Sequence, residues 1–170
     1  MATINSSNTY VTPSATGEVN FPGQCSFMAY LSSTATDVTG DGTNYTILYD
    51  TELWDIGSNY NPATGIFTAP YTGLYLFVAG TTWGGLAAGN TLIDSVFRNA
   101  AITAYSVMID TTAATARDAN NQLTTSTCAQ YYLTAADTVL VSARAFSTAK
   151  VVDVLGGATI QTYFGGMLVE

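Results

Sequence analysis

Histidine is absent from this sequence of 170 residues, and lysine and arginine together number four. Without histidine the chain cannot form a Ser-His-Asp triad or a Cys-His pair, and it lacks a common zinc ligand. Four cations cannot form the basic stripe that neutralises nucleic-acid phosphates, nor a basic anchor for an anionic membrane surface. We therefore expect no histidine-based catalysis, no nucleic-acid binding and no membrane association.

Charged residues of both signs are scarce, at 9% of the chain, whereas soluble domains commonly carry about 25%. The twelve acids give a net charge of −8 and are spread along the sequence without forming a block. Apolar residues make up 48%, and the abundance of Thr, Val and Tyr favours strands. Much of the surface must therefore be uncharged polar groups or be covered by partners.

The length suits one domain with a short extension. Residues 1–23 are rich in Ser, Thr and Asn and have too few apolar side chains for a core, so we expect a polar N-terminal arm. Residues 24–170 alternate strand-like segments with Gly, Asn and Asp turns, which indicates one β-sandwich domain. We expect strands at 91–98, 101–110, 124–132, 138–146 and 158–169, and a loop at 111–118. The beginning of the chain lacks the features of a secretory signal, and no apolar run is long enough to span a membrane.

The few reactive side chains have ordinary structural explanations. Cys25 and Cys128 either form one disulfide or remain buried thiols, and the thiol interpretation is favoured because no secretory signal accompanies them. Lys150 is the single lysine, and a solvated surface position is its default. We therefore assign no catalytic residue, cofactor or metal ligand.

Two groups of acids were weighed as sites. Asp50 and Glu52 share one face of a strand, and glycosidases need two carboxylates across a sugar, but cross-strand or solvent-facing positions explain this pair equally well. Asp37 and Asp41 could contribute to a calcium site, although their segment lacks the EF-hand spacing. A plain turn is the favoured interpretation of that segment.

An ordered pattern runs from Tyr49 through Asp55, Tyr60 and Phe67 to the strand that begins Gly73-Leu74-Tyr75-Leu76-Phe77. Its spacing of aromatics, an acid and a glycine resembles the signature of C1q domains, which are compact, trimer-forming β-sandwiches. The family usually has Phe where this chain has Tyr49.

Two later segments strengthen the resemblance. Residues 133–141 resemble the family's Leu-x-x-Gly-Asp-x-Val segment, with Ala136 where Gly is usual, and residues 164–169 resemble its closing strand. The resemblance implies a ten-stranded antiparallel jelly-roll sandwich of C1q/TNF type that assembles as a trimer. The collagen-like triplets of animal C1q proteins are absent from the arm.

The strand from Gly73 to Gly80 is apolar at every position between its glycines. A strand covered on one side would show polar residues at alternate positions, so both faces need cover. Tyr75 and Phe77 lie on one face, with Leu74, Leu76 and Val78 on the other. We expect the core to cover one set and a threefold neighbour the other; a strand wholly buried in one monomer is the alternative. The candidate interface or core residues are Leu74, Tyr75, Leu76, Phe77, Phe164 and Met167. Trp54, Tyr60 and Phe67 are expected in the core.

The expected function is that of a non-enzymatic structural protein of a phage virion. The run from Thr39 to Glu52 resembles C1q-like domains of phage virion proteins, and a domain with an arm suits a capsid decoration or cement protein, or a fibre head. Its expected partners are further copies of itself and the major capsid protein or another virion protein. Its expected location is the virion surface, after assembly in the host cytoplasm.

The alternative is a soluble trimeric recognition module that binds glycans or proteins, such as a host-surface glycan, through outer loops. Trp83, flanked by glycines, is the candidate ligand contact in that case, although a core or interface position is the favoured interpretation of this residue.

Overall fold

The computed structural model describes residues 12–13, 19–20, 24–87, 92–100, 104–111, 118–146 and 148–169, with the backbone alone for 12–13, 19–20 and 104–111. β1 (Thr12–Pro13) and β2 (Val19–Asn20) pair antiparallel with each other. Most of the expected arm and of the expected loop at 111–118 lies outside the described residues, so both stay predictions. Within the described ranges, no helix has the length and apolar character needed to cross a membrane.

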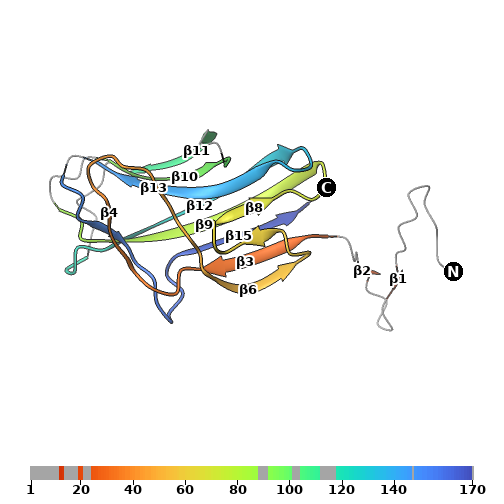
Figure 1. The fold of residues 1–170 in the computed structure, drawn as a ribbon, viewed down its shortest axis with the longest axis horizontal. Coiled ribbons are helices and arrows are strands. Elements are labelled where there is room, and N and C mark those ends of the chain that lie inside the picture. The colour runs from red at the N-terminus through yellow and green to blue at the C-terminus, as the bar shows by residue number, and fades with distance from the viewer. Residues whose placement is uncertain are drawn as a thin grey trace.

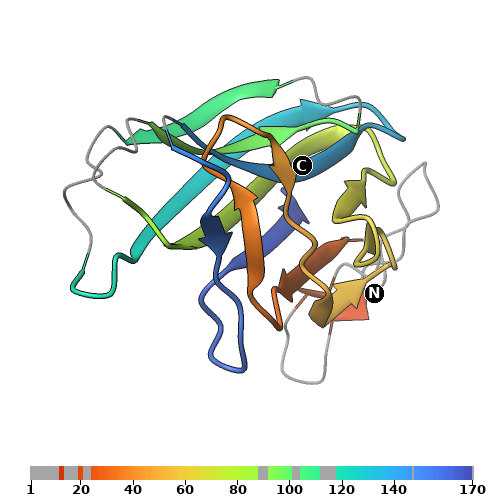
Figure 2. The same cartoon turned by 60° about the vertical axis from the view of Figure 1, so that its left-hand side comes forward.

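Two antiparallel sheets pack face to face (Figures 1 and 2). The large sheet has the order β4 (Ala35–Thr39), β14 (Val152–Val154), β9 (Gly73–Gly84), β15 (Tyr163–Leu168), β3 (Ser26–Tyr30) and β6 (Thr51–Ile56). β12 (Leu123–Leu133) pairs with the other side of β9 along its whole length. The small sheet has the order β11 (Ala104–Thr111), β10 (Ile93–Arg98), β13 (Thr138–Ala145), β8 (Ile66–Thr68) and β7 (Tyr60–Asn61), and β5 (Tyr45–Thr46) pairs with β13.

The expected all-β antiparallel sandwich is present. β10, β11, β12 and β13 fall within about three residues of their predicted ranges. The last predicted strand, at 158–169, begins only at Tyr163. Before that point the Thr162 side chain donates a hydrogen bond to the Leu155 carbonyl and accepts one from the Thr82 N–H, which holds the chain in a loop. β4 and β14 were not foreseen.

The core lies between the sheets and is largely aromatic. Inward-facing side chains of β9 alternate with outward ones, as the period of a strand requires, so Tyr75 and Phe77 are fully buried. Phe27 of β3 stacks on Tyr60 and Phe67, with ring centroids 4.9 and 5.0 Å apart. Phe164 meets Phe27 edge to face. Each fully buried large apolar side chain contributes about 1.5–3 kcal/mol to folding, so this cluster fixes how the sheets sit on each other.

The β6–β7 turn is closed by Asp55, as its place in the sequence pattern predicted. Its carboxylate accepts hydrogen bonds from the backbone N–H groups of Asn59 and Tyr60, at 3.2 and 2.9 Å. The Tyr60 hydroxyl donates to the Tyr49 carbonyl at 3.0 Å. These bonds link the aromatic pattern to the turn and satisfy polar groups at the end of the core.

Candidate functional site

The outward face of the large sheet is the candidate functional site. On β9, Leu74 and Leu76 are half-buried and Val78 is exposed, while the alternate residues Tyr75 and Phe77 fill the core. The prediction of two apolar faces on this strand is therefore confirmed. The strand is not buried wholly inside one chain, so its outward side chains are available to a partner.

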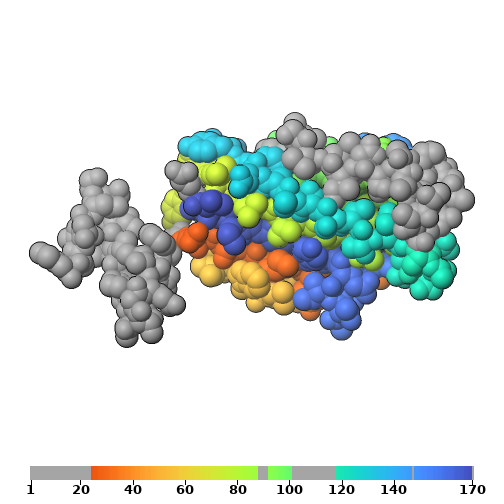
Figure 3. Space-filling view, turned by 180° about the vertical axis from the view of Figure 1, so that it is seen from behind, coloured from red at the N-terminus to blue at the C-terminus, as the bar shows by residue number. Residues whose placement is uncertain are grey.

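Neighbouring strands extend this face. Outward apolar side chains of β15, β3 and β6 include Met167, Met28, Trp54 and Ile56. The outward row of β12 has Tyr132 and Cys128 among the uncharged polar side chains of Thr124, Ser126 and Gln130. The ladders place Met167 beside Leu76 and Ser26, and Trp54 beside Met28. Figure 3 views this surface directly, with β6, β3, β15, β9 and β12 side by side from bottom to top.

No charged residue occurs in β3, β9, β12 or β15. We call the outward side of these four strands, together with Trp54 and Ile56 of β6, the uncharged face. The exposed apolar side chains of this face lie among uncharged polar ones, and large exposed apolar patches mark contact sites. Loss of charge at the centre of a contact is also typical of protein interfaces. The face can therefore bind another protein surface.

A hollow of about 250 Å³ interrupts the uncharged face over β9, β15, β3 and β6, with Leu76 and Val78 of β9 in its lining. Gly165 forms part of its floor, and the Met28 sulfur lies over it, 2.7 Å from where a Cβ would stand. Met28, Met167 and Trp54 surround it. The hollow is lined mainly by apolar side chains.

The predicted interface or core residues divide between the two sides of the large sheet. Tyr75, Phe77 and Phe164 are fully buried in the core of one chain, so they cannot contact a neighbour. Leu74, Leu76 and Met167 lie on the uncharged face. An acidic residue at Tyr75 or Phe77 would therefore test folding, while one at the outward positions would test assembly.

Trp83 is buried, in agreement with the favoured interpretation of a core or interface position, whereas Trp54 is exposed. Trp83 has 0% of its surface exposed, and its indole N–H donates to the Thr125 hydroxyl at 3.0 Å. A ligand cannot reach it, so the candidate ligand contact at Trp83 is wrong. Trp54, expected in the core, is 49% exposed on β6. Its strand, Thr51–Ile56, shows no apolar alternation, which was the available signal that it lies at the edge of a sheet.

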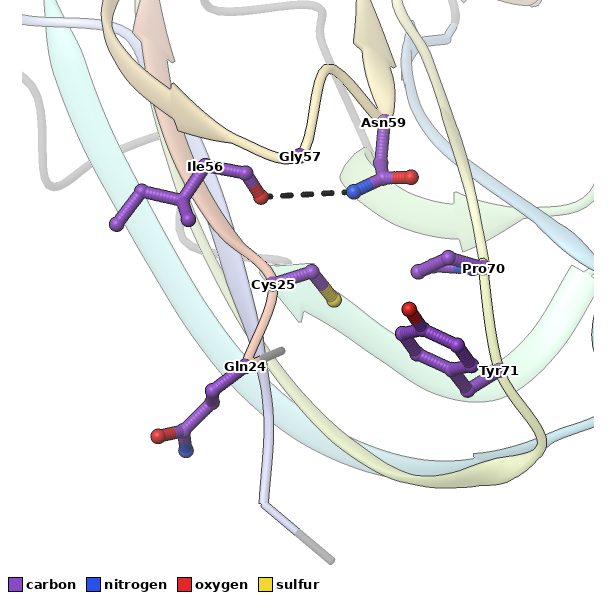
Figure 4. A pocket seen from close by; sticks show the side chains of 7 residues that line it. All are labelled: Gln24, Cys25, Ile56, Gly57, Asn59, Pro70 and Tyr71. Atoms are coloured by element: carbon purple, nitrogen blue, oxygen red, sulfur yellow. Dashed lines mark hydrogen bonds between the residues drawn. The ribbon is translucent and has the colours of Figure 1, made fainter. Parts of the chain in front are cut away.

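Pockets elsewhere are small or shallow. The pocket of about 150 Å³ at the end of the sandwich is bordered by Cys25, Tyr71 and Pro70, with Asn59 bonded to the Ile56 carbonyl (Figure 4). Burial raises the pKa of the Cys25 thiol, which makes it a poor nucleophile at neutral pH. A more open groove of about 510 Å³ lies between the turn at 118–122 and the loop at 155–162, and Tyr163 and Gln161 border it.

The remaining candidate groups have structural roles. Cys25 and Cys128 are both free, the first buried and the second exposed on the uncharged face. Asp50 accepts hydrogen bonds from the backbone and hydroxyl of Ser32. Asp41 accepts one from the Thr43 N–H, and hydrogen bonding to Thr43 lowers the Asp41 pKa. Among the described residues, no three acidic, Cys or His side chains gather as metal ligands.

Comparison with known proteins gives a consistent result. The model of the C1q domain family matches residues 26–169. The globular domain of zebrafish complement 1qA has 16% identity and a TM-score of 0.57, with 86% of this chain and 98% of that chain covered. Murine APRIL has 10% identity and a TM-score of 0.60, with 86% of this chain and 99% of that chain covered. Eiger TNF from S. frugiperda has 15% identity and a TM-score of 0.59, with 86% of this chain and 92% of that chain covered.

A search of curated proteins found no match. At these identities the solved structures show the shared fold alone, an antiparallel sandwich of C1q/TNF type. The family match, which spans most of the sequence, goes further. The chain belongs to the C1q domain family.

Proposed function

We propose that the protein is a homotrimeric structural module in which each copy buries its uncharged face against its neighbours. Domains of the C1q/TNF type are non-enzymatic and typically form trimers. The observation that carries the proposal is the set of four strands without a charged side chain, which present exposed Met167 and Tyr132 and have exposed Trp54 of β6 beside them.

Physical arguments favour self-association. Removing apolar surface from water stabilises a complex by about 25 cal/mol per Å² before the costs of association. Copies of a chain with net charge −8 repel one another, and that repulsion is smallest when the touching surfaces carry no charge. The uncharged face meets both conditions.

Light scattering tests this assembly. We expect a mass of about three times 17.8 kDa, and a monomer at micromolar concentration would contradict the proposal. Val78→Asp should give folded monomers, because it places a charge on the contact surface. Leu48→Asp is the matched control: Leu48 is similarly exposed but lies outside the uncharged face, so this variant should remain trimeric.

We further propose that the trimer belongs to a virion surface, as a decoration or cement protein or a fibre head, attached partly through residues 1–23. The support is the resemblance of the run from Thr39 to Glu52 to C1q-like domains of phage virion proteins, and the low charge content. The proposed partner is the major capsid protein or another virion protein. Mass spectrometry of purified particles checks this location, and absence of the protein from particles would refute it.

The second candidate function is recognition of glycans or proteins. The groove of about 510 Å³ favours it, because Tyr163, Gln161 and Gln122 border this groove and offer an aromatic ring and amide groups to a sugar. A glycan array with the protein should show saturable binding that is lost in Tyr163→Ala. Because Tyr163 and Thr82 lie on the outward side of β15 and β9, this function and burial of the whole uncharged face in a trimer exclude each other. Trp83→Ala is unsuitable, because Trp83 belongs to the core.

A further inference from the structure

A groove of about 550 Å³ lies on the small sheet, over β7, β8 and the start of β13, and the turn before β7 borders it. We propose that this groove binds a neutral oligosaccharide. The inference goes beyond the trimer proposed above and does not depend on it. None of the residues that line the groove belongs to the uncharged face, so burial of that face leaves the groove open.

The period of the strands places hydrogen-bonding side chains on the floor of the groove. Tyr60 of β7 and Phe67 of β8 are buried in the core, so the alternate residues Asn61 and Thr68 lie on the outward side of the sheet. The ladder sets Thr68 opposite Thr138 of β13. The floor is therefore made by paired strands, which hold polar groups in place more firmly than a loop does.

The lining of the groove carries no charge. It has six uncharged side chains that can form hydrogen bonds, namely Ser58, Asn59, Asn61, Thr64, Thr68 and Thr138. An anionic ligand would find no cation here, and a cationic ligand would find no carboxylate. Ile66 and Pro70 add apolar surface beside the polar groups. Hydroxyls and amides around a small apolar surface match a neutral sugar, which presents hydroxyls around its C–H faces.

Several of these polar groups have hydrogen-bonding capacity left over. Asn61 uses its Oδ1 in the turn that follows β7, and its amide N–H groups bond to no residue that the structure describes. Asn59 makes one long bond, of 3.5 Å, to the Ile56 carbonyl, and its Oδ1 is turned away from that carbonyl (Figure 4). The hydroxyls of Ser58 and Thr68 have no partner within the described ranges. Sugar hydroxyls, which both donate and accept, can satisfy such a mixed set.

Two other classes of ligand fit the groove less well. β7 is the last strand of the small sheet, and an open edge attracts an extended peptide. The Asp55 carboxylate already accepts hydrogen bonds from the N–H groups of Asn59 and Tyr60, so a peptide strand cannot use these donors. A flat aromatic ligand needs a ring to stack on, but Tyr60 is 5% exposed and its ring packs on Phe27. A saturated, hydroxyl-rich ligand remains.

The backbone at Ser58 supports a function for its side chain. Ser58 has a φ of 55°, a left-handed conformation that a Cβ disfavours. Asp37 and Asn121 have a similar φ, but Asp and Asn adopt it more readily than Ser does. Glycine would hold the Ser58 conformation at lower cost, as Gly57 does just before it. Strained residues of this kind gather where a ligand is held, and Ser58 borders the groove.

A glycan array followed by calorimetric titration tests the site. The full-length protein is applied to neutral and to sialylated oligosaccharides, and the neutral oligosaccharide that binds best is then titrated. We expect saturable binding that weakens about twofold to tenfold in Thr68→Val, the loss expected for one hydrogen bond. Thr36→Val is the matched control. Thr36 is also an exposed threonine on a strand, but it lies on β4, away from the groove, so this variant should bind as the wild type does.

Ser58→Gly separates binding from folding. Glycine accepts the left-handed conformation, so we expect the urea midpoint not to fall. Loss of the hydroxyl should weaken binding about twofold to tenfold. Weaker binding by a variant that is no less stable cannot come from unfolding. Unchanged binding in both Ser58→Gly and Thr68→Val would overturn the inference.

Three further results would also overturn it. Binding that is kept in Thr68→Val but lost in Tyr163→Ala would place the sugar in the groove beside β9 and β15 instead. A preference for the sialylated oligosaccharides would contradict the uncharged lining, and a folded protein that binds none of the oligosaccharides would contradict the site itself. Light scattering tests the trimer separately, so the failure of either proposal leaves the other standing.

Discussion

Tyr49 and Ala136 are two residues at which this chain departs from its family's usual pattern, and both carry a local cost. The Tyr49 hydroxyl is buried near the Thr81 side chain without a partner in good hydrogen-bond geometry, and burial raises its pKa well above the ordinary value. Ala136 has a φ of 76°, a left-handed conformation that side chains with a Cβ disfavour. The family's usual Phe and Gly would relieve each cost.

Ala136→Gly should stabilise the protein by about 0.5–1 kcal/mol. Relief of the left-handed conformation is worth about 1–2 kcal/mol, and the greater freedom of glycine in the unfolded chain removes roughly 0.4–1 kcal/mol of that gain. Urea unfolding measures the difference. The neighbouring Ala135, which has no positive φ, is the control, and Ala135→Gly should destabilise. A lower midpoint for Ala136→Gly would contradict the strain argument.

Tyr49→Phe should also raise the free energy of unfolding, by up to about 1–3 kcal/mol, because it removes a buried polar group that has no partner. Tyr60→Phe is the matched control. The Tyr60 hydroxyl donates to the Tyr49 carbonyl, so its removal should cost about 0.5–1.5 kcal/mol. Thermal unfolding of the two variants should therefore shift in opposite directions. A loss of stability in Tyr49→Phe would show that its hydroxyl is satisfied, for instance by water.

At the scale of elements, β15 lies between β9 and β3 and holds these two strands in one sheet. It pairs with both strands, and its glycines allow the neighbouring side chains to close over it. Gly166 faces the core, where Phe77 and Phe27 occupy the space of its missing side chain. Gly165 faces outward and leaves the hollow. Of these two adjacent glycines, Gly166 allows close packing of aromatic rings in the core, and Gly165 forms part of the hollow on the outward side of the sheet.

Gly166→Ala should destabilise the domain by about 1–3 kcal/mol, as overpacking of a filled core does. The added Cβ would lie 2.5 Å from a ring carbon of Phe77, which the rest of the aromatic cluster holds in place. Gly157→Ala is the control, since a Cβ there meets nothing within 4 Å. Chemical denaturation compares them. Equal midpoints for the two variants would mean that the Phe77 ring can move.

At the scale of the whole molecule, the two tryptophans report on assembly. Trp83 is 0% exposed within one chain and Trp54 is 49% exposed, so only Trp54 can change its contact with water when copies associate. Trp54 lies at the rim of the hollow, which the proposed trimer would cover. The fluorescence of an otherwise unmodified chain therefore distinguishes the monomer from the assembly.

Acrylamide should quench neither tryptophan in the proposed wild-type trimer. In monomeric Val78→Asp it should quench Trp54 but not Trp83. We expect the quenching slope to rise severalfold in that variant and to stay at the wild-type value in Leu48→Asp. Trp54→Phe in the monomeric background should abolish the rise, which assigns it to Trp54. An equally quenched wild-type trimer would place β6 outside the interface.

Prediction from the sequence succeeded where the signal is local. The alternation along Gly73–Gly80 identified a strand with two apolar faces because successive side chains of any strand point to opposite sides. Asp55 was recognised as a turn residue because its hydrogen bonds are to residues four and five positions later. The Tyr49-to-Phe77 pattern indicated the fold because its spacing resembles a family signature.

Which side of a strand meets water depends on the strands beside it, so the positions of Trp54 and Trp83 could not be read from the sequence. Trp83 is buried because the inward row of β9 lies under the small sheet. Trp54 belongs to β6, which pairs with β3 alone among the described strands. The hollow likewise requires Gly165, Met28 and Trp54 to meet across three strands. The sequence by itself determined the sandwich, its family and its shortage of charge, since these follow from composition and spacing. The tertiary structure alone decided that the four strands without charged residues lie side by side and form one face, because strand pairing joins segments that are far apart in the sequence.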